Sequence, residues 1–231
     1  MKGLIAVVVV LVVLIGGLLI VDRVSVAYAD TLISQQMTSS LRLSQQPTVR
    51  IQGFPFLTQW ASGDYSEIDV TLPSVTSASV TVNQVTAIVT GVKAPGLATS
   101  GGQFKSAMAQ RIVLSGVVPL SEVPLPSGFQ AHASGNQLQV TGTVSLLGLQ
   151  APVTAVIGIH LSGSTVTFDP TSIQVAGSSL SPSMTRSLTA QFKRTIDIGR
   201  LPFSVSVTGI TVTPSGLAVT ATASNVPLSP G

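Results

Sequence analysis

Cysteine is absent from this 231-residue chain, which excludes disulfides, thiolate metal sites and an anchor built on a lipidated cysteine. Charged residues are also scarce: they make up 8% of the chain, against about 25% in an ordinary soluble domain. The few basic residues are scattered and lack the interleaved aromatics of a nucleic-acid site. The fold must therefore rest on a hydrophobic core, and nucleic acid is excluded as a partner.

Recognisable catalytic and metal-binding motifs are missing as well. The two histidines, His132 and His160, stand far apart, and no acidic cluster accompanies them. Glycine-rich phosphate loops and the Gly-x-Ser-x-Gly serine motif do not occur. Glu67 and Asp69 share one face of a predicted strand, where a solvated surface explains them. We therefore predict no enzyme activity, no cofactor and no metal site.

Aliphatic residues are abundant, above all in one run near the start of the chain. Residues 3–21 carry no charge and consist of Val, Leu, Ile, Gly and one Ala. As a helix these nineteen residues span roughly 28 Å, close to the hydrocarbon thickness of a bilayer. Lys2 precedes the run, so the positive-inside rule places the remainder outside the cytoplasm. We predict a single-pass anchor at residues 1–21 in the cytoplasmic membrane, with the C-terminal domain on its outer side.

A cleavable signal peptide is the alternative interpretation of the same run. Ala27-Tyr28-Ala29 has the small-x-small form that signal peptidase prefers. The run is, however, longer than the ~7–15 apolar residues of most signal peptides, and Asp22-Arg23 interrupts the approach to the cleavage site. Both interpretations place residues 22–231 outside the cytoplasm, and they differ in whether the anchor is retained.

Residues 22–231 are predicted to form one exported, β-rich domain with two helices. Apolar residues recur at helical spacing after the anchor and predict an amphipathic helix over about 22–43, which Pro47 would end. Its predicted apolar face comprises Val24, Tyr28, Leu32 and Met37, with Val21 and Ile33 beside them. Ser181-Pro182 offers an N-cap and a first-turn proline for a second helix over about 182–196.

Most of the remaining sequence alternates between apolar and polar residues. This period of two is typical of half-buried antiparallel strands, with one dry face and one wet face. The clearest stretches are 68–72, 80–83, 138–144, 153–161 and 166–175. We therefore predict an α+β fold in which a strongly twisted antiparallel sheet or half-barrel wraps on a long helix.

One short segment concentrates the aromatic residues, which are only 4% of the chain. Residues 53–60 contain two of the seven phenylalanines and the only tryptophan. These rings could plug one end of the core, or they could form an apolar mouth that faces a membrane, because aromatic rings favour the interface between hydrocarbon and water. The candidate mouth residues are Phe54, Phe56, Leu57, Trp60, Leu201 and Phe203, and the candidate lipid-headgroup residues are Arg42, Arg50 and Arg200.

These residues give the chain a resemblance to the LmeA family of actinobacterial envelope proteins. The resemblance extends from the anchor to the end, and Gly-Phe-Pro-Phe-Leu-Thr-Gln at 53–59 is its most specific motif. It also rests on Val21-Asp22-Arg23-Val24, Leu201-Pro202-Phe203 and Val212-Thr213-Pro214-Ser215-Gly216-Leu217. The family implies a periplasmic-side domain that binds a phospholipid and assists mannolipid assembly without being a glycosyltransferase. It also implies a fold similar to the tubular lipid-binding superfamily.

The leading hypothesis is a membrane-tethered, non-enzymatic protein that binds a phospholipid or lipid-linked glycan and assists envelope assembly, with envelope biosynthesis proteins as further candidate partners. It expects an apolar hollow, left vacant by the protein's own side chains, with Phe54, Phe56 and Trp60 near its mouth. The first alternative is an envelope scaffold that binds protein partners and has a solid core. The second is a hydrolase of envelope lipids or glycans that uses His160, Asp64, Glu67 and Asp169.

Overall fold

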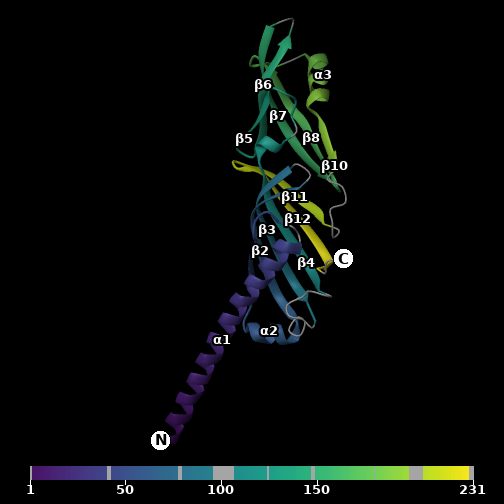
Figure 1. Ribbon diagram of the computed structural model, residues 1–231. Helices are drawn as coiled ribbons and strands as arrows, with labels where there is room; N and C mark the ends of the chain where they lie inside the picture. Colours follow the sequence, from purple (N-terminus) through teal and green to yellow (C-terminus); the bar gives the residue numbers. More distant parts are fainter. Residues whose placement is uncertain are drawn as a thin grey trace. The chain divides into compact units, whose positions relative to one another are not determined.

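The computed structural model describes residues 2–40, 43–77, 80–95, 107–123, 125–146, 149–179, 181–197 and 205–228. Strands dominate, and three α-helices and one 3-10 turn accompany them in the described residues (Figure 1). In chain order the elements are α1 Lys2–Ser40, β1 Thr48–Gln52, α2 Phe56–Ser62, β2 Asp64–Ser77, β3 Val80–Lys93, β4 Met108–Val118, η1 Leu120–Glu122, β5 Phe129–Ser134, β6 Gln137–Leu146, β7 Leu149–Ser162, β8 Thr165–Val175, β9 Ser178–Ser179, α3 Pro182–Phe192, β10 Arg194–Asp197, β11 Ser206–Thr213 and β12 Gly216–Pro227.

The strands form two sheets. One has the order β1-β2-β3-β4-β12-β11, and the other has the order β10-β8-β7-β6-β5, with β9 paired to β8. Neither sheet closes into a barrel, and the predicted α+β class is confirmed. By its internal contacts the chain divides into two compact units. The first unit comprises residues 1–72, 86–112 and 224–231, and the second comprises 73–85 and 113–223.

In the first unit, α1 is one unbroken helix that contains both the apolar run and the segment predicted to follow it (Figure 1). Its later turns pack on β1, which pairs antiparallel with β2 and brings Val49 opposite Val70 and Ile51 opposite Ile68. These four side chains are buried, as the period of two predicts. The end of the predicted helix, residues 41 and 42, lies outside the described residues.

The predicted buried face of this helix is wrong at its start, whereas Ile33 is buried as predicted and Leu32 and Met37 are half-buried. Val24 and Tyr28 are 65% and 66% exposed, whereas Asp22 and Ser34 are buried together with Ala29 and Ile33. Those polar side chains can be buried because backbone groups of the following segment satisfy their hydrogen bonds, as described below. Hydrophobicity alone therefore did not predict that Asp22 and Ser34 are buried.

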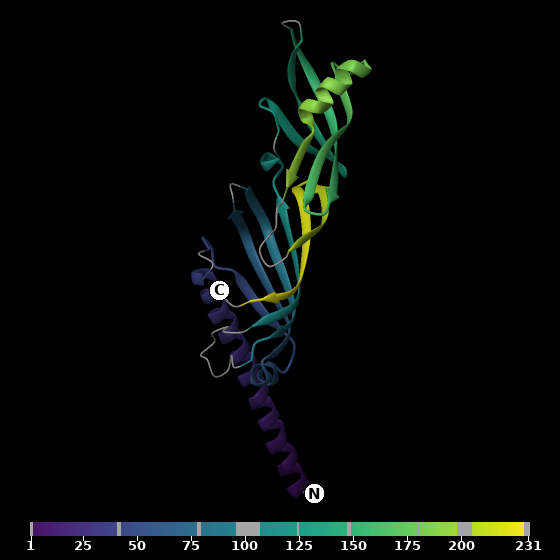
Figure 2. The same cartoon turned by 90° about the vertical axis from the view of Figure 1, so that its right-hand side faces the viewer.

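The second unit has an apolar core between α3 and the sheet of β5 to β8 and β10 (Figure 2). Leu188 and Phe192 of α3 are buried, and the Phe192 ring meets the Phe129 ring edge-on with centroids 4.8 Å apart. The sheet contributes Leu138, Val140, Val153, Ala155, Ile157, Val166, Phe168, Ile173 and Val175 to the same core. This core holds no buried charge, so it rests on packing alone.

The helix α3 begins as predicted but ends four residues early. Pro182 occupies its first turn after Ser181, and the last helical residue is Phe192. Lys193 has extended dihedral angles, and Ile196 pairs with Val166 in the ladder of β10 and β8. Ile196 thus still points to the core, from a strand, which explains why its spacing fitted the helical stripe.

Candidate functional site

The end of the apolar run is fastened to the segment that carries the aromatic residues. Asp22 is 2% exposed, and its Oδ1 accepts a hydrogen bond from the Leu57 backbone N–H at 2.9 Å. One face of α1 continues this pattern: Asp30 Oδ1 accepts from the Ile51 N–H at 2.9 Å, and the Ser34 hydroxyl donates to the Pro47 carbonyl. The first turn of α2 is therefore held beside the residue that follows the apolar run.

Apolar side chains remain uncovered at this junction. From Val12 to Val21 the large aliphatic side chains of α1 are 42% to 67% exposed. Phe54 is 55% exposed, and the Arg23 guanidinium lies over its ring, 5.6 Å from the centroid. An exposed ring, a stacked cation and a bare aliphatic helix thus adjoin in one place, an arrangement that suits a membrane interface.

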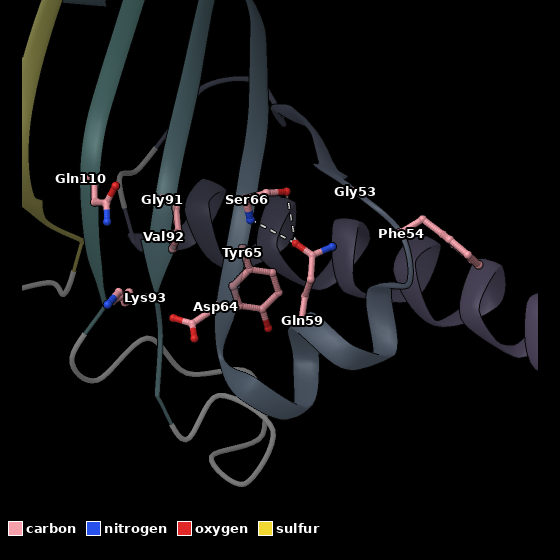
Figure 3. Close-up of a pocket in the computed structure, with 10 residues that line it drawn as sticks. All are labelled: Gly53, Phe54, Gln59, Asp64, Tyr65, Ser66, Gly91, Val92, Lys93 and Gln110. Carbon is pink, nitrogen blue, oxygen red and sulfur yellow. Dashed lines mark hydrogen bonds between the residues drawn. The ribbon is translucent and has the colours of Figure 1, made fainter.

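The motif at 53–59 has a structural explanation. Gly53 has φ +96°, and a Cβ there would lie 2.8 Å from Gln59 Nε2 and 2.9 Å from Ser66 Oγ, so a larger residue does not fit. The Gln59 amide then joins two strands: its Nε2 donates to the Gln52 carbonyl at 3.1 Å, and its Oε1 accepts from the Ser66 N–H at 3.0 Å (Figure 3). Gly53 and Gln59 are required together, because the missing Cβ of Gly53 leaves the space that the Gln59 amide fills.

The predicted mouth residues take different places. Phe56 is 2% exposed and lies in the core, where its ring packs on Trp60 with centroids 5.7 Å apart. Trp60 and Leu57 are half-buried, and Phe54 is exposed. Phe56 thus supports the segment from beneath, whereas Phe54 presents its ring to the surroundings.

Several predicted residues are separate from this segment or lie outside the description. Leu201, Phe203, Arg42 and Arg200 lie outside the described residues. Arg50 is exposed on β1, opposite Asp69 in the ladder, and does not line the pocket described next. The assignment of the three arginines to a lipid headgroup therefore stays a prediction.

An open pocket of about 510 Å³ lies beside Phe54. Its lining comes from the turn before α2, from α2 itself and from three strands, and comprises Gly53, Phe54, Gln59, Asp64, Tyr65, Ser66, Gly91, Val92, Lys93 and Gln110 (Figure 3). Tyr65 is 2% exposed, its hydroxyl has no hydrogen-bond partner among the described residues, and burial raises its pKa to about 12. This pocket is open and its lining includes polar groups, and of the three rings predicted at the mouth of an apolar hollow it contains Phe54 but not Phe56 or Trp60.

Sequence reasoning missed Tyr65, Lys93 and Gln110 because they come from strands far apart in the chain. One signal was available. Gly91 interrupts a strand of good β-formers, has φ +62°, and would place a Cβ 2.6 Å from the Gln110 amide. A glycine inside a strand marks such close approaches.

The acidic and histidine residues of the hydrolase hypothesis are divided between the two units. Asp64 and Glu67 belong to the first unit, and His160 and Asp169 belong to the second. Across the described residues, no group of three or more His, Asp or Glu could hold a metal ion. Two further open pockets of about 520 Å³ occur in the second unit, one at Leu120–His132 and one between β7 and β11.

Comparison with known families gives one decisive match, to the LmeA-like phospholipid-binding family over residues 20–222. The chain belongs to this family. The matched range begins just before Asp22 and contains the motif at 53–59 and the whole pocket lining. The family resemblance read from the sequence is confirmed, and the LmeA-like family supports lipid binding as the function. Searches of curated proteins and of solved structures found no match.

Proposed function

We propose that this LmeA-like chain is a non-enzymatic phospholipid-binding protein, anchored by α1 in the cytoplasmic membrane with its strands on the outer side. The observation that carries the proposal is the hydrogen bond from the Leu57 N–H to buried Asp22. It holds α2 and Phe54 at the point where the apolar run ends. A bilayer around that run would therefore reach the aromatic segment.

The exposed side chains of α1 support the anchor. The described part of the helix contains one candidate span, Val12–Ser39, and 11% of its apolar 18-residue window is buried in the protein. Bare aliphatic side chains over several turns are unfavourable in water, at about 25 cal/mol per Å² of apolar surface. Lys2 before the run supports the outward orientation of the strands.

The packing of α1 also favours an uncleaved anchor over a signal peptide. Cleavage after Ala29 would divide a continuous helix at a residue that is 3% exposed. It would also remove Asp22 and leave the Leu57 N–H without its acceptor. A buried backbone N–H that loses its partner is destabilising by about 1–3 kcal/mol.

Lipid contact is proposed at Phe54, Leu57 and Trp60, with Leu201 and Phe203 as further candidates. A ring such as Phe54 that moves from water to the acyl-chain boundary contributes on the order of 1 kcal/mol, because about half of its surface is already covered. Arg23 beside it can meet a lipid phosphate without leaving the ring. The segment would therefore engage individual lipids at the membrane surface.

The finer role proposed is assistance to envelope assembly, in which the protein presents a phospholipid or lipid-linked glycan during mannolipid synthesis. An exposed ring next to a pocket of amide, hydroxyl and charged groups supports this role, because a lipid-linked polar group has the same two parts. The scaffold alternative has one observation in its favour. The second unit has a core filled by its own side chains, as a protein-binding module requires.

Photo-crosslinking separates these functions. The full chain, purified in detergent, would be incubated with a phospholipid that carries a diazirine in its acyl chain, and the labelled peptides would be mapped. We expect labelling within residues 53–62 that decreases several-fold in Phe54→Ser. The matched control is Ile88→Ser, which changes another exposed apolar residue of the first unit and should leave labelling intact. Labelling confined to α1, with no effect of Phe54→Ser, would contradict the proposal and favour the scaffold.

A further inference from the structure

The pocket beside Phe54 contains opposite charges that do not neutralise each other. Asp64 and Lys93 both line it and are both exposed. Neither side chain forms an ion pair or a hydrogen bond with the described residues. In Figure 3 both groups lie at the same end of the pocket. A ligand with separated positive and negative groups would pair with both, whereas a simple anion would approach the Asp64 carboxylate unfavourably.

Tyr65 gives a second and independent indication of a ligand. Its side chain lines the pocket between those of Asp64 and Gln59, and its buried hydroxyl lacks a partner (Figure 3). Native proteins rarely leave a buried hydroxyl unsatisfied, because phenylalanine would fill the same space without the desolvation penalty. A ligand oxygen would supply the missing acceptor. The phenol is protonated, and so a donor, at physiological pH even at its ordinary pKa of about 10, and burial raises that pKa further.

Gln110 of β4 adds a further polar group to the pocket lining. Its amide makes no hydrogen bond with the described residues and lies against Gly91, where a Cβ would come within 2.6 Å of it. Glycine at this position keeps the amide in the pocket. The cavity of about 510 Å³ is within the usual range of small-ligand sites, roughly 300–1,000 Å³. It is therefore large enough for a phospholipid headgroup.

We infer that this pocket binds the headgroup of a zwitterionic, amine-bearing phospholipid, with the phosphate at Lys93 and the ammonium at Asp64. The inference rests on the proposed membrane position, which places the pocket next to the ring of Phe54 and so beside the acyl chains. The phosphate accepts from Lys93 and from the Tyr65 hydroxyl, and the Gln110 amide contacts the polar linker. The preference for one headgroup over another then depends on where the lipid carries its positive and negative groups and not on its net charge.

The test uses the full chain in detergent and short-chain phospholipids with ethanolamine or glycerol headgroups and identical acyl chains. Calorimetric titration should give tighter binding of the ethanolamine lipid. Asp64→Asn should weaken binding of the ethanolamine lipid about three- to fivefold, because one exposed ion pair is lost. It should not weaken binding of the anionic glycerol lipid, whose phosphate the Asp64 carboxylate repels. Lys93→Gln should weaken the binding of both lipids by a similar factor. Lys193→Gln, which removes an exposed lysine of the second unit, is the control and should change neither.

Tyr65→Phe separates a ligand role from a structural role. We expect this variant to raise the Tm of the lipid-free protein, because an unsatisfied hydroxyl is removed, and to weaken both lipids. A structural role alone would change the Tm and leave both affinities intact, which would count against the inference. Equal or stronger binding of the glycerol lipid, or Asp64→Asn without effect, would overturn it. If Phe54→Ser still reduces photo-labelling in that case, the proposed function stands and only the headgroup assignment fails.

Discussion

The two helices α1 and α3 each pack on a sheet, and they do so by different means. The buried side of α3 is apolar, with Leu188 and Phe192 in a core that contains no charge. The buried side of α1 includes Asp22 and Ser34, whose oxygens meet backbone groups of the following segment. Apolar packing allows a helix to shift or rotate on the sheet. A hydrogen bond that a particular backbone N–H donates to a side chain fixes the helix at one place. The difference indicates that α1 must hold α2 at a defined place.

The contact that should show the largest effect belongs to α3. Phe192→Ala removes a buried ring that packs edge-on against Phe129, and we expect a loss of about 3–5 kcal/mol in the free energy of unfolding. Denaturant unfolding of the full chain in detergent, followed by circular dichroism, measures it. Phospholipid labelling at 53–62 under native conditions should remain, because the first unit is unaltered. A loss below about 1 kcal/mol would show that the core of the second unit can collapse around the gap.

The polar attachment of α1 should respond to the chemistry of one residue. Asp22→Ala should destabilise the protein by about 1.5–3 kcal/mol, the usual value for a hydrogen bond with a charged partner. Asp22→Asn keeps an acceptor oxygen and should lose less. Equal losses in the two variants would mean that the carboxylate acts through its charge and not by positioning Leu57. The same denaturant measurement applies.

The glycine of the family motif allows a matched comparison. Gly53 and Gly163 both have positive φ, but only Gly53 would bring a Cβ against other side chains, since nothing lies within 4 Å of Gly163. Gly53→Ala should cost on the order of 1–3 kcal/mol, and Gly163→Ala should fall at the lower end of that range. Thermal unfolding of both variants tests the difference. Equal Tm values would show that the Gln59 side chain moves aside for the added Cβ without a loss of stability.

The smallest effect concerns the ionisation of Tyr65. With Tyr28→Phe, the single remaining phenol should titrate at about 12 when followed by its ultraviolet absorbance. Because the folded pKa is raised, folding holds the proton, and stability should fall as the pH rises above about 10, the unfolded value. Titration at the unfolded value under native conditions would mean that the hydroxyl is hydrated. A bound phospholipid should change the pH at which Tyr65 ionises.

Periodicity predicted the strands because each has one buried face. Ile68, Val70 and Leu72 are buried as expected, and the turn between Ser134 and Gln137 joins β5 to β6 as its sequence suggests. The buried face of α1 could not be predicted in this way. Its anchoring groups are polar, and their partners are backbone atoms at Ile51 and Leu57, which no hydrophobic pattern records.

The candidate site was predicted in part. The concentration of aromatics at 53–60 identified the segment, because such a cluster is unusual in a chain so poor in rings. Sequence did not separate buried Phe56 from exposed Phe54, since both follow the same pattern. It also missed the pocket, because Tyr65, Lys93 and Gln110 meet only through strand pairing.

Trp60 provides the most direct test of the claim that the segment 53–62 lies at a bilayer surface. It is the only tryptophan of the chain, so its fluorescence reports this segment alone. The full chain would be reconstituted into vesicles whose phospholipids carry bromine either near the headgroup or near the ends of the acyl chains. The account predicts strong quenching by the shallow bromines and weaker quenching by the deep ones. Fluorescence equal to that in unbrominated vesicles would contradict it.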